Sequence, residues 1–99
     1  MKCEAMIVGT LTVRILIPGA QSLKDRRRVL KGLKDRIRNG FNVSVSEIDA
    51  TELWQRATLG IAMAGDDRRY INGALSDLVN FLRVQPGSQL VDYELEFLL

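Results

Sequence analysis

The chain has 99 residues, the length of a single domain, with 46% hydrophobic residues, 26% charged residues and a formal net charge of +2. This balance excludes a disordered chain, and we expect no membrane span because no apolar run is long enough. With one cysteine, Cys3, and no histidine, we expect no internal disulfide, no metal site and no cofactor. A lone thiol and an N-terminus without the features of a secretory leader favour the cytoplasm.

A strand is predicted over residues 5–17, because apolar and polar side chains alternate there. Pro18 and Gly19 predict the turn that ends it. The apolar face would consist of Ile7, Leu11, Val13, Ile15 and Ile17.

A helix is predicted to start at Ser22 and to stop at Asn39-Gly40. Ser22 and Asp25 approximate a capping box, and Asn39-Gly40 predicts a helix end with positive φ. Arg26 falls inside the apolar arc, so we expect its charged head to extend towards solvent. The apolar stripe is formed by Leu23, Leu30, Leu33 and Ile37.

Two strands are predicted next, over residues 41–48 and 56–64, separated by a short polar connection that contains Trp54. Their inward side chains would be Val43 and Val45 in the first and Ala57, Leu59, Ile61 and Met63 in the second.

A second helix then begins at Asp66 or Asp67 as N-cap and ends before Pro86-Gly87. Its apolar side is predicted to hold Tyr70, Ile71, Ala74, Leu75, Leu78 and Leu82. In a last strand, residues 89–98, Val91, Tyr93, Leu95 and Phe97 alternate with Asp92, Glu94 and Glu96.

This order predicts one α+β domain over residues 1–99, a ferredoxin-like β-α-β-β-α-β sandwich. We expect a four-stranded antiparallel sheet in the order 4-1-3-2, with both helices on one face. The first strand should be central because its apolar set is the longest, and the acidic last strand should be an edge. A right-handed crossover over the first helix is expected to make strands one and three parallel neighbours.

Five motifs are distributed over most of the sequence: Ile17–Lys24 (IPGAQSLK), Arg27–Lys31 (RRVLK), Arg38-Asn39, Phe41–Val45 (FNVSV) and Leu53–Ala57 (LWQRA). Together they resemble the YlxP-like family of small bacterial proteins of unknown function. The resemblance implies a ferredoxin-like fold and a cytoplasmic bacterial protein, and it implies no established activity and no catalytic residues. Genes of this family tend to lie among those for translation factors, which implies a link to RNA or the ribosome.

The predicted first helix is strongly basic, with a charge of +6 over residues 22–39 against −4 for the remaining residues. A helical projection gathers six cations in an arc of roughly 120°. Two interpretations remain open: a patch that binds a polyanion such as RNA or the ribosome, or a solvated face with internal ion pairs. The six candidate nucleic-acid-binding residues are Lys24, Arg27, Arg28, Lys31, Lys34 and Arg38.

Other features give weaker hypotheses. Trp54 could stack on a base or cover a core edge, and the turn from Gly65 to Asp67 is interpreted as an N-cap rather than a phosphate site. The outer sheet face, with Thr12 and Gly60, lacks the aromatics of RNA-recognition modules, so a second copy could dock there or on an edge strand. We expect no enzyme, because no histidine base or nucleophile elbow is present. A homodimeric interaction module is therefore the alternative to RNA binding, and a small-molecule sensor is a third possibility.

Overall fold

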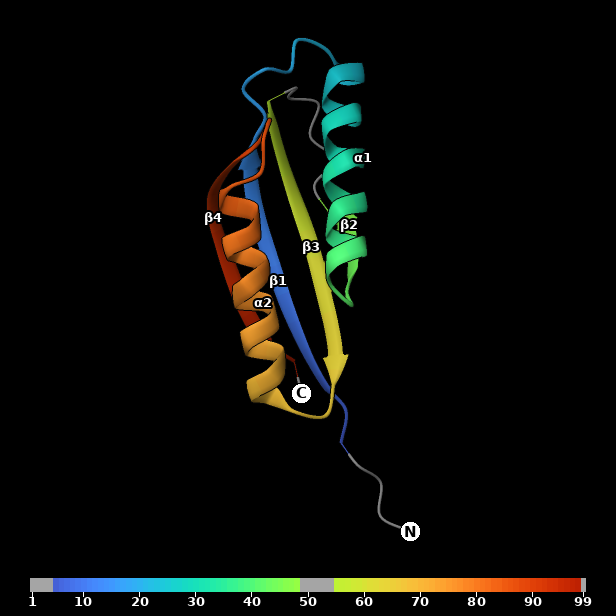
Figure 1. Cartoon of the computed structure of the whole chain (residues 1–99), viewed down its shortest axis with the longest axis vertical. Helices are drawn as coiled ribbons and strands as arrows, with labels where there is room; N and C mark the ends of the chain where they lie inside the picture. Colours follow the sequence, from blue (N-terminus) through green and yellow to red (C-terminus); the bar gives the residue numbers. More distant parts are fainter. Residues whose placement is uncertain (1–4, 49–54, 99) are drawn as a thin grey trace.

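The computed structural model describes residues 5–48 and 55–98. Its elements are β1 (Ile7–Leu16), α1 (Leu23–Gly40), β2 (Ser44–Glu47), β3 (Arg56–Gly65), α2 (Arg68–Arg83) and β4 (Gln89–Phe97). The strands form one sheet in the order β2-β3-β1-β4, and both helices lie on one face of it (Figure 1). The predicted ferredoxin-like fold and sheet order are confirmed.

The direction of β3 corrects one expectation, because β1 and β3 are antiparallel rather than parallel. The crossover through α1 fixes the direction of β2, the strand on which it ends. The chain then reverses and β3 returns between β1 and β2, antiparallel to both. A crossover helix therefore sets strands one and two parallel without making them neighbours.

The core lies between the helix-covered face of the sheet and the two helices. The predicted inward residues of β1 and β3 are buried except for Ile7, which is half-buried. The apolar stripe of α1 is buried except for Leu23, which is 39% exposed in the first turn. The strand residues of this core include Leu11, Val13, Ile15, Ala57, Leu59, Ile61 and Met63, and the α1 residues are Leu30, Leu33 and Ile37. Periodicity therefore places α1 correctly on the sheet.

Arg26 differs from its expected solvent-directed position, because it is 5% exposed. Its Nε donates to the carbonyl oxygen of Arg56 at 3.1 Å, and its Nη2 forms an ion pair with Oε2 of Glu47. Partners from β2 and β3 therefore satisfy the guanidinium inside the protein, which a burial of this depth requires. These contacts attach the start of α1 to the edge strand.

The end of α1 also differs from the prediction. The helix continues through Gly40, and Phe41 follows in an extended conformation with φ −140°, so no positive φ ends this helix. The second strand therefore begins at Ser44 rather than at residue 41. The ring of Phe41 packs edge-to-face on Phe81 with a centroid distance of 5.6 Å, so it joins the two helices instead of the sheet.

In α2 and β4, two apolar residues lie outside the predicted faces. Tyr70 is 67% exposed because it projects about 100° from the centre of the α2 stripe, whereas Val79 on the other flank is buried. A register shift between Arg14 and Ile15 places Leu90 opposite Ile15 and leaves Val91 56% exposed. A bulge therefore breaks the alternation that was predicted for the last strand.

Candidate nucleic-acid interface

The first turn of α1 is fixed by the predicted capping residues. Ser22 Oγ accepts from the backbone N–H of Asp25, and Asp25 Oδ2 accepts from the N–H of Gln21. This arrangement is a capping box in which the returning carboxylate bonds one residue earlier than usual. The N-cap fixes where the helix starts, and the burial of Leu30, Leu33 and Ile37 against the sheet turns most of the cations outwards.

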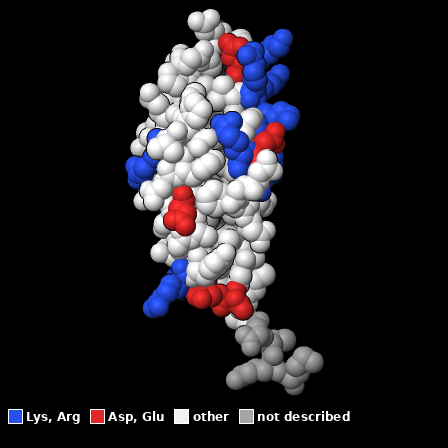
Figure 2. Space-filling model, in the orientation of Figure 1, with Lys and Arg blue, Asp and Glu red and all other residues white. Residues whose placement is uncertain are grey.

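The six predicted cations do share one surface of α1, which we call the basic ridge: Lys24, Arg27, Arg28, Lys31, Lys34 and Arg38. All of them are exposed except Lys34, which is half-buried. From Lys24 to Arg38 the ridge extends about 21 Å along the helix at 1.5 Å per residue. Figure 2 shows basic side chains gathered along the side of the molecule that α1 occupies.

Two carboxylates lie within the ridge and pair with some of its cations. Nη2 of Arg28 is 3.2 Å from Oδ1 of Asp25, and Nζ of Lys31 is 3.0 Å from Oδ2 of Asp35. Asp35 is shared, because Nη1 of Arg38 lies 3.6 Å from its Oδ1. Internal pairing therefore involves three of the six cations.

The other three cations, Lys24, Arg27 and Lys34, form no ion pair with any residue in the ranges 5–48 and 55–98. With six cations against two carboxylates, the ridge keeps a surplus of +4. A concentration of like charge at this spacing is unfavourable for an isolated helix. Internal ion pairs therefore account for part of the charge of the ridge, and three of its cations keep their charge without such a pair among the described residues.

Arg38 also contacts the sheet. Its Nη2 donates to the backbone carbonyl oxygen of Val45 in the edge strand β2 at 3.0 Å. This hydrogen bond satisfies an edge acceptor and covers part of a strand edge that a foreign strand could otherwise pair with. Arg38 thus has a structural role that the other ridge residues lack, and its substitution would change more than charge.

The uncovered sheet face differs from the basic ridge in its charge and in the size of its side chains. Arg14 on β1 pairs with Asp92 at 2.8 Å and with Glu94 at 3.5 Å, and the hydrogen bond to Asp92 raises the pKa of Arg14 above its ordinary value. Arg14 therefore offsets one of the two negative charges, and the group stays acidic on the surface. Beside them the outer face is built from small residues, which give no stacking platform for bases: Thr10, Thr12, Thr58, Gly60 and Ala62.

The turn between β3 and α2 is an N-cap, as predicted. Oδ1 of Asp67 accepts from the N–H groups of Arg69 and Tyr70 at 3.0 and 3.3 Å, so the carboxylate occupies the position that a phosphate would need. Trp54 and Cys3 lie outside the described residues. Within the described ranges, no group of three or more acidic, cysteine or histidine side chains gathers in one place.

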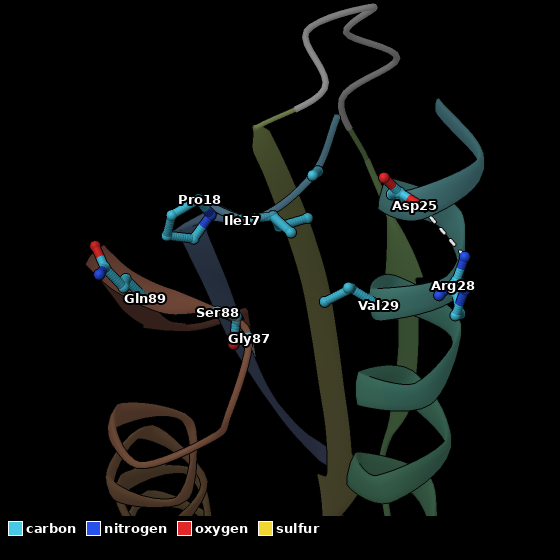
Figure 3. A pocket seen from close by; sticks show the side chains of 10 residues that line it. Ile17, Pro18, Asp25, Arg28, Val29, Gly87, Ser88 and Gln89 are labelled. Atoms are coloured by element: carbon cyan, nitrogen blue, oxygen red, sulfur yellow. Dashed lines mark hydrogen bonds and ion pairs between the residues drawn. The ribbon is translucent and has the colours of Figure 1, made fainter. Parts of the chain in front are cut away.

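Sequence reasoning missed a pocket of about 420 Å³ at one end of the ridge. It lies where β1 ends, α1 begins and the connection from α2 to β4 passes, so its walls come from three distant parts of the chain (Figure 3). The one sequence signal was the Pro86-Gly87 turn, where Gly87 has a φ of +82°. Arg28 lines this pocket and also belongs to the ridge.

Comparison with known proteins agrees with the motifs. The family described as "Protein of unknown function (DUF503)" matches residues 8–95, and the chain belongs to this family. A relative, "Uncharacterized protein YlxP" of Bacillus subtilis (strain 168), is 37% identical over 76 residues, which are 77% of this chain and 83% of the relative. The predicted resemblance to YlxP-like proteins is therefore confirmed.

Among solved structures, the de novo designed protein Foldit4 is similar to this chain with a TM-score of 0.57. The similarity covers 96% of this chain and 98% of the designed protein at 14% sequence identity, so it concerns the fold alone. None of the helices in the described part of the chain has the length and hydropathy needed to span a membrane.

Proposed function

We propose that this protein is a cytoplasmic RNA-associated or ribosome-associated binding protein, and not an enzyme, that contacts the phosphate backbone through the basic ridge. The observation that supports the proposal most is the surplus of +4 on the basic ridge. Lys24, Arg27 and Lys34 form no ion pair among the described residues, and a polyanion would relieve their mutual repulsion while it releases counterions.

The chemistry of the ridge favours contact with the backbone over contact with bases. Helix α1 contains no aromatic residue, so no ridge side chain can stack on an exposed base. Phosphate contacts alone position a protein on a nucleic acid without selecting its sequence. We therefore expect little sequence preference and a preference for structured RNA, in which phosphates of one strand follow a regular path along the ridge.

Salt dependence tests the proposal directly. If four to six phosphates are engaged, log affinity against log salt falls with a slope of roughly −3 to −5. The measurement is fluorescence anisotropy of a labelled RNA hairpin between low and physiological salt. Because Arg38 also bonds the sheet edge, the variant that tests the ridge is K24Q/R27Q/K34Q, which leaves that bond and the internal ion pairs in place.

The matched control removes three positive charges elsewhere, in R36Q/R56Q/R69Q. All three of these arginines are exposed and lie outside the ridge. We expect the ridge variant to lose about half of the salt slope and the control to keep nearly all of it. Equal losses in both variants would mean that net charge, and not the ridge, governs binding, and no binding by the natural sequence at low salt would refute the proposal.

A homodimer is the second candidate function, and one observation favours it. Within residues 5–48 and 55–98 no helix covers the outer sheet face (Figure 1), and there Ile48, which is 57% exposed, extends over Gly60. A second copy docked on this face or on an edge strand would bury such surface. Light scattering at micromolar concentration distinguishes the candidates: a strict monomer argues against the dimer, whereas a stable dimer without RNA binding supports it over the ridge.

A further inference from the structure

The pocket at the start of α1 has an apolar floor. Ile17 and Ala20 at its base are almost fully buried, and the half-buried Val29 extends into it from α1 (Figure 3). Gly87 lies on the opposite wall, and a Cβ built on it would be 3.9 Å from Cγ1 of Val29. A side chain at this position would therefore contact Val29, and Pro18 completes the apolar lining of the pocket.

The rim of the pocket is polar but carries no net charge. Asp25 and Arg28 form an ion pair on one side, and Ser88 and Gln89 lie on the other. The carboxylate of Asp25 already occupies the positive N-terminal end of α1, which disfavours an anion there. The floor and rim together suit a neutral, planar ligand with hydrogen-bond donors and acceptors along its edge, and a nucleobase has these properties.

Arg28 connects the pocket with the basic ridge. Its side chain is 72% exposed, so its remaining N–H donors can reach a phosphate while it stays paired with Asp25. A strand that follows the ridge towards the start of α1 therefore arrives at the mouth of the pocket. An unpaired nucleotide at that point needs only to turn its base inwards, and a bulge or loop allows this at lower cost than a paired base.

We propose that the pocket receives one unpaired nucleobase of an RNA whose adjacent phosphates lie on the basic ridge. This inference rests on the proposed function and names the class of RNA: structured RNA with a bulged or looped-out nucleotide. The base packs between Val29 and Pro18, and the Asp25 carboxylate accepts a hydrogen bond from an exocyclic amino group. Arg28 holds the phosphate of the same nucleotide.

The test compares two labelled RNA hairpins of equal stem length, one fully paired and one with a single-nucleotide bulge, by anisotropy at fixed salt. We expect the bulged hairpin to bind about tenfold more tightly, because stacking and edge contacts of one base are of that order. In Val29→Phe the added ring fills the pocket, so both hairpins should bind with the affinity of the paired one. Ser76→Phe on the exposed face of α2 is the control and should keep the difference.

The outcomes separate the two proposals. If both hairpins bind the natural sequence equally and with a steep salt slope, the pocket proposal is overturned and the ridge proposal stands. If neither hairpin binds, both proposals fail. If thermal melting shows that Val29→Phe does not fold, Ser88→Trp at the rim replaces it, and retention of the tenfold difference in that variant overturns the pocket proposal.

Discussion

Gly9 on β1 and Ile71 on α2 approach so closely that no side chain fits between them: a Cβ built on Gly9 would lie 2.5 Å from Cγ2 of Ile71. The same Cβ would lie 3.0 Å from Cδ1 of Leu75, so the helix meets the strand at this point along two of its turns. Gly9 interrupts the apolar alternation of β1 because α2 occupies the space of its side chain.

Gly9→Ala should therefore destabilise the protein by about 1–3 kcal/mol through overpacking, although alanine is compatible with a strand. Ile71→Ala alone should cost about 2–5 kcal/mol because it leaves a cavity. The double variant should cost clearly less than the sum, since the cavity accepts the new methyl group. Urea unfolding of the four proteins measures this coupling, and strict additivity would show that Ile71 does not define the space at Gly9.

The Arg26–Glu47 pair leads to a second prediction. Glu47→Gln leaves the buried guanidinium without its counter-charge and should lower the free energy of unfolding by about 2–3 kcal/mol, less than for a fully buried pair because Glu47 is partly exposed. Adding Arg26→Met removes the uncompensated charge and should restore part of the loss. Chemical denaturation of both variants checks this order. A cost below about 0.5 kcal/mol for Glu47→Gln would contradict the structural role of the pair.

Alanine substitution at two neighbouring positions of α1 should change the stability of the protein by very different amounts. Leu30 is 2% exposed in the core, so Leu30→Ala should cost about 2–5 kcal/mol. Lys31 is exposed, and its ion pair with Asp35 lies on the surface, so Lys31→Ala should cost less than about 0.5 kcal/mol. Thermal melts compare the two. Equal stabilities would mean that the wrong face of α1 has been assigned to the core.

The two adjacent aspartates before α2 provide an internal control. Asp67 accepts from two N–H groups of the first turn, whereas Asp66 makes no such bond, so Asp67→Ala should cost about 0.5–2 kcal/mol and Asp66→Ala only a few tenths. Differential scanning calorimetry on the single variants resolves the difference. A larger loss for Asp66→Ala would place the cap one residue earlier.

Local patterns in the sequence predicted every strand and helix, because period-two alternation and the helical stripe reflect burial on one face. The predictions failed where the burial of a residue depends on contacts with residues far away in the sequence. Arg26 is buried because Glu47, 21 residues later, supplies a counter-charge, and Val91 is exposed because pairing with β1 introduces a bulge. The six ridge residues could be placed from helix geometry alone, whereas the pocket required three separate segments to meet.

Helix α1, which carries the basic ridge, and strand β4, which carries three acids, lie towards opposite edges of the sheet (Figure 1). The two edge strands are about 14 Å apart at 4.8 Å per strand. The molecule therefore has an electric dipole moment across its strands, whereas its net charge is only +2. At low ionic strength a polyanion would exert a torque that turns α1 towards it before contact. At 0.15 M salt the screening length of about 8 Å is shorter than that separation, so the two edges act independently and the orienting torque fades.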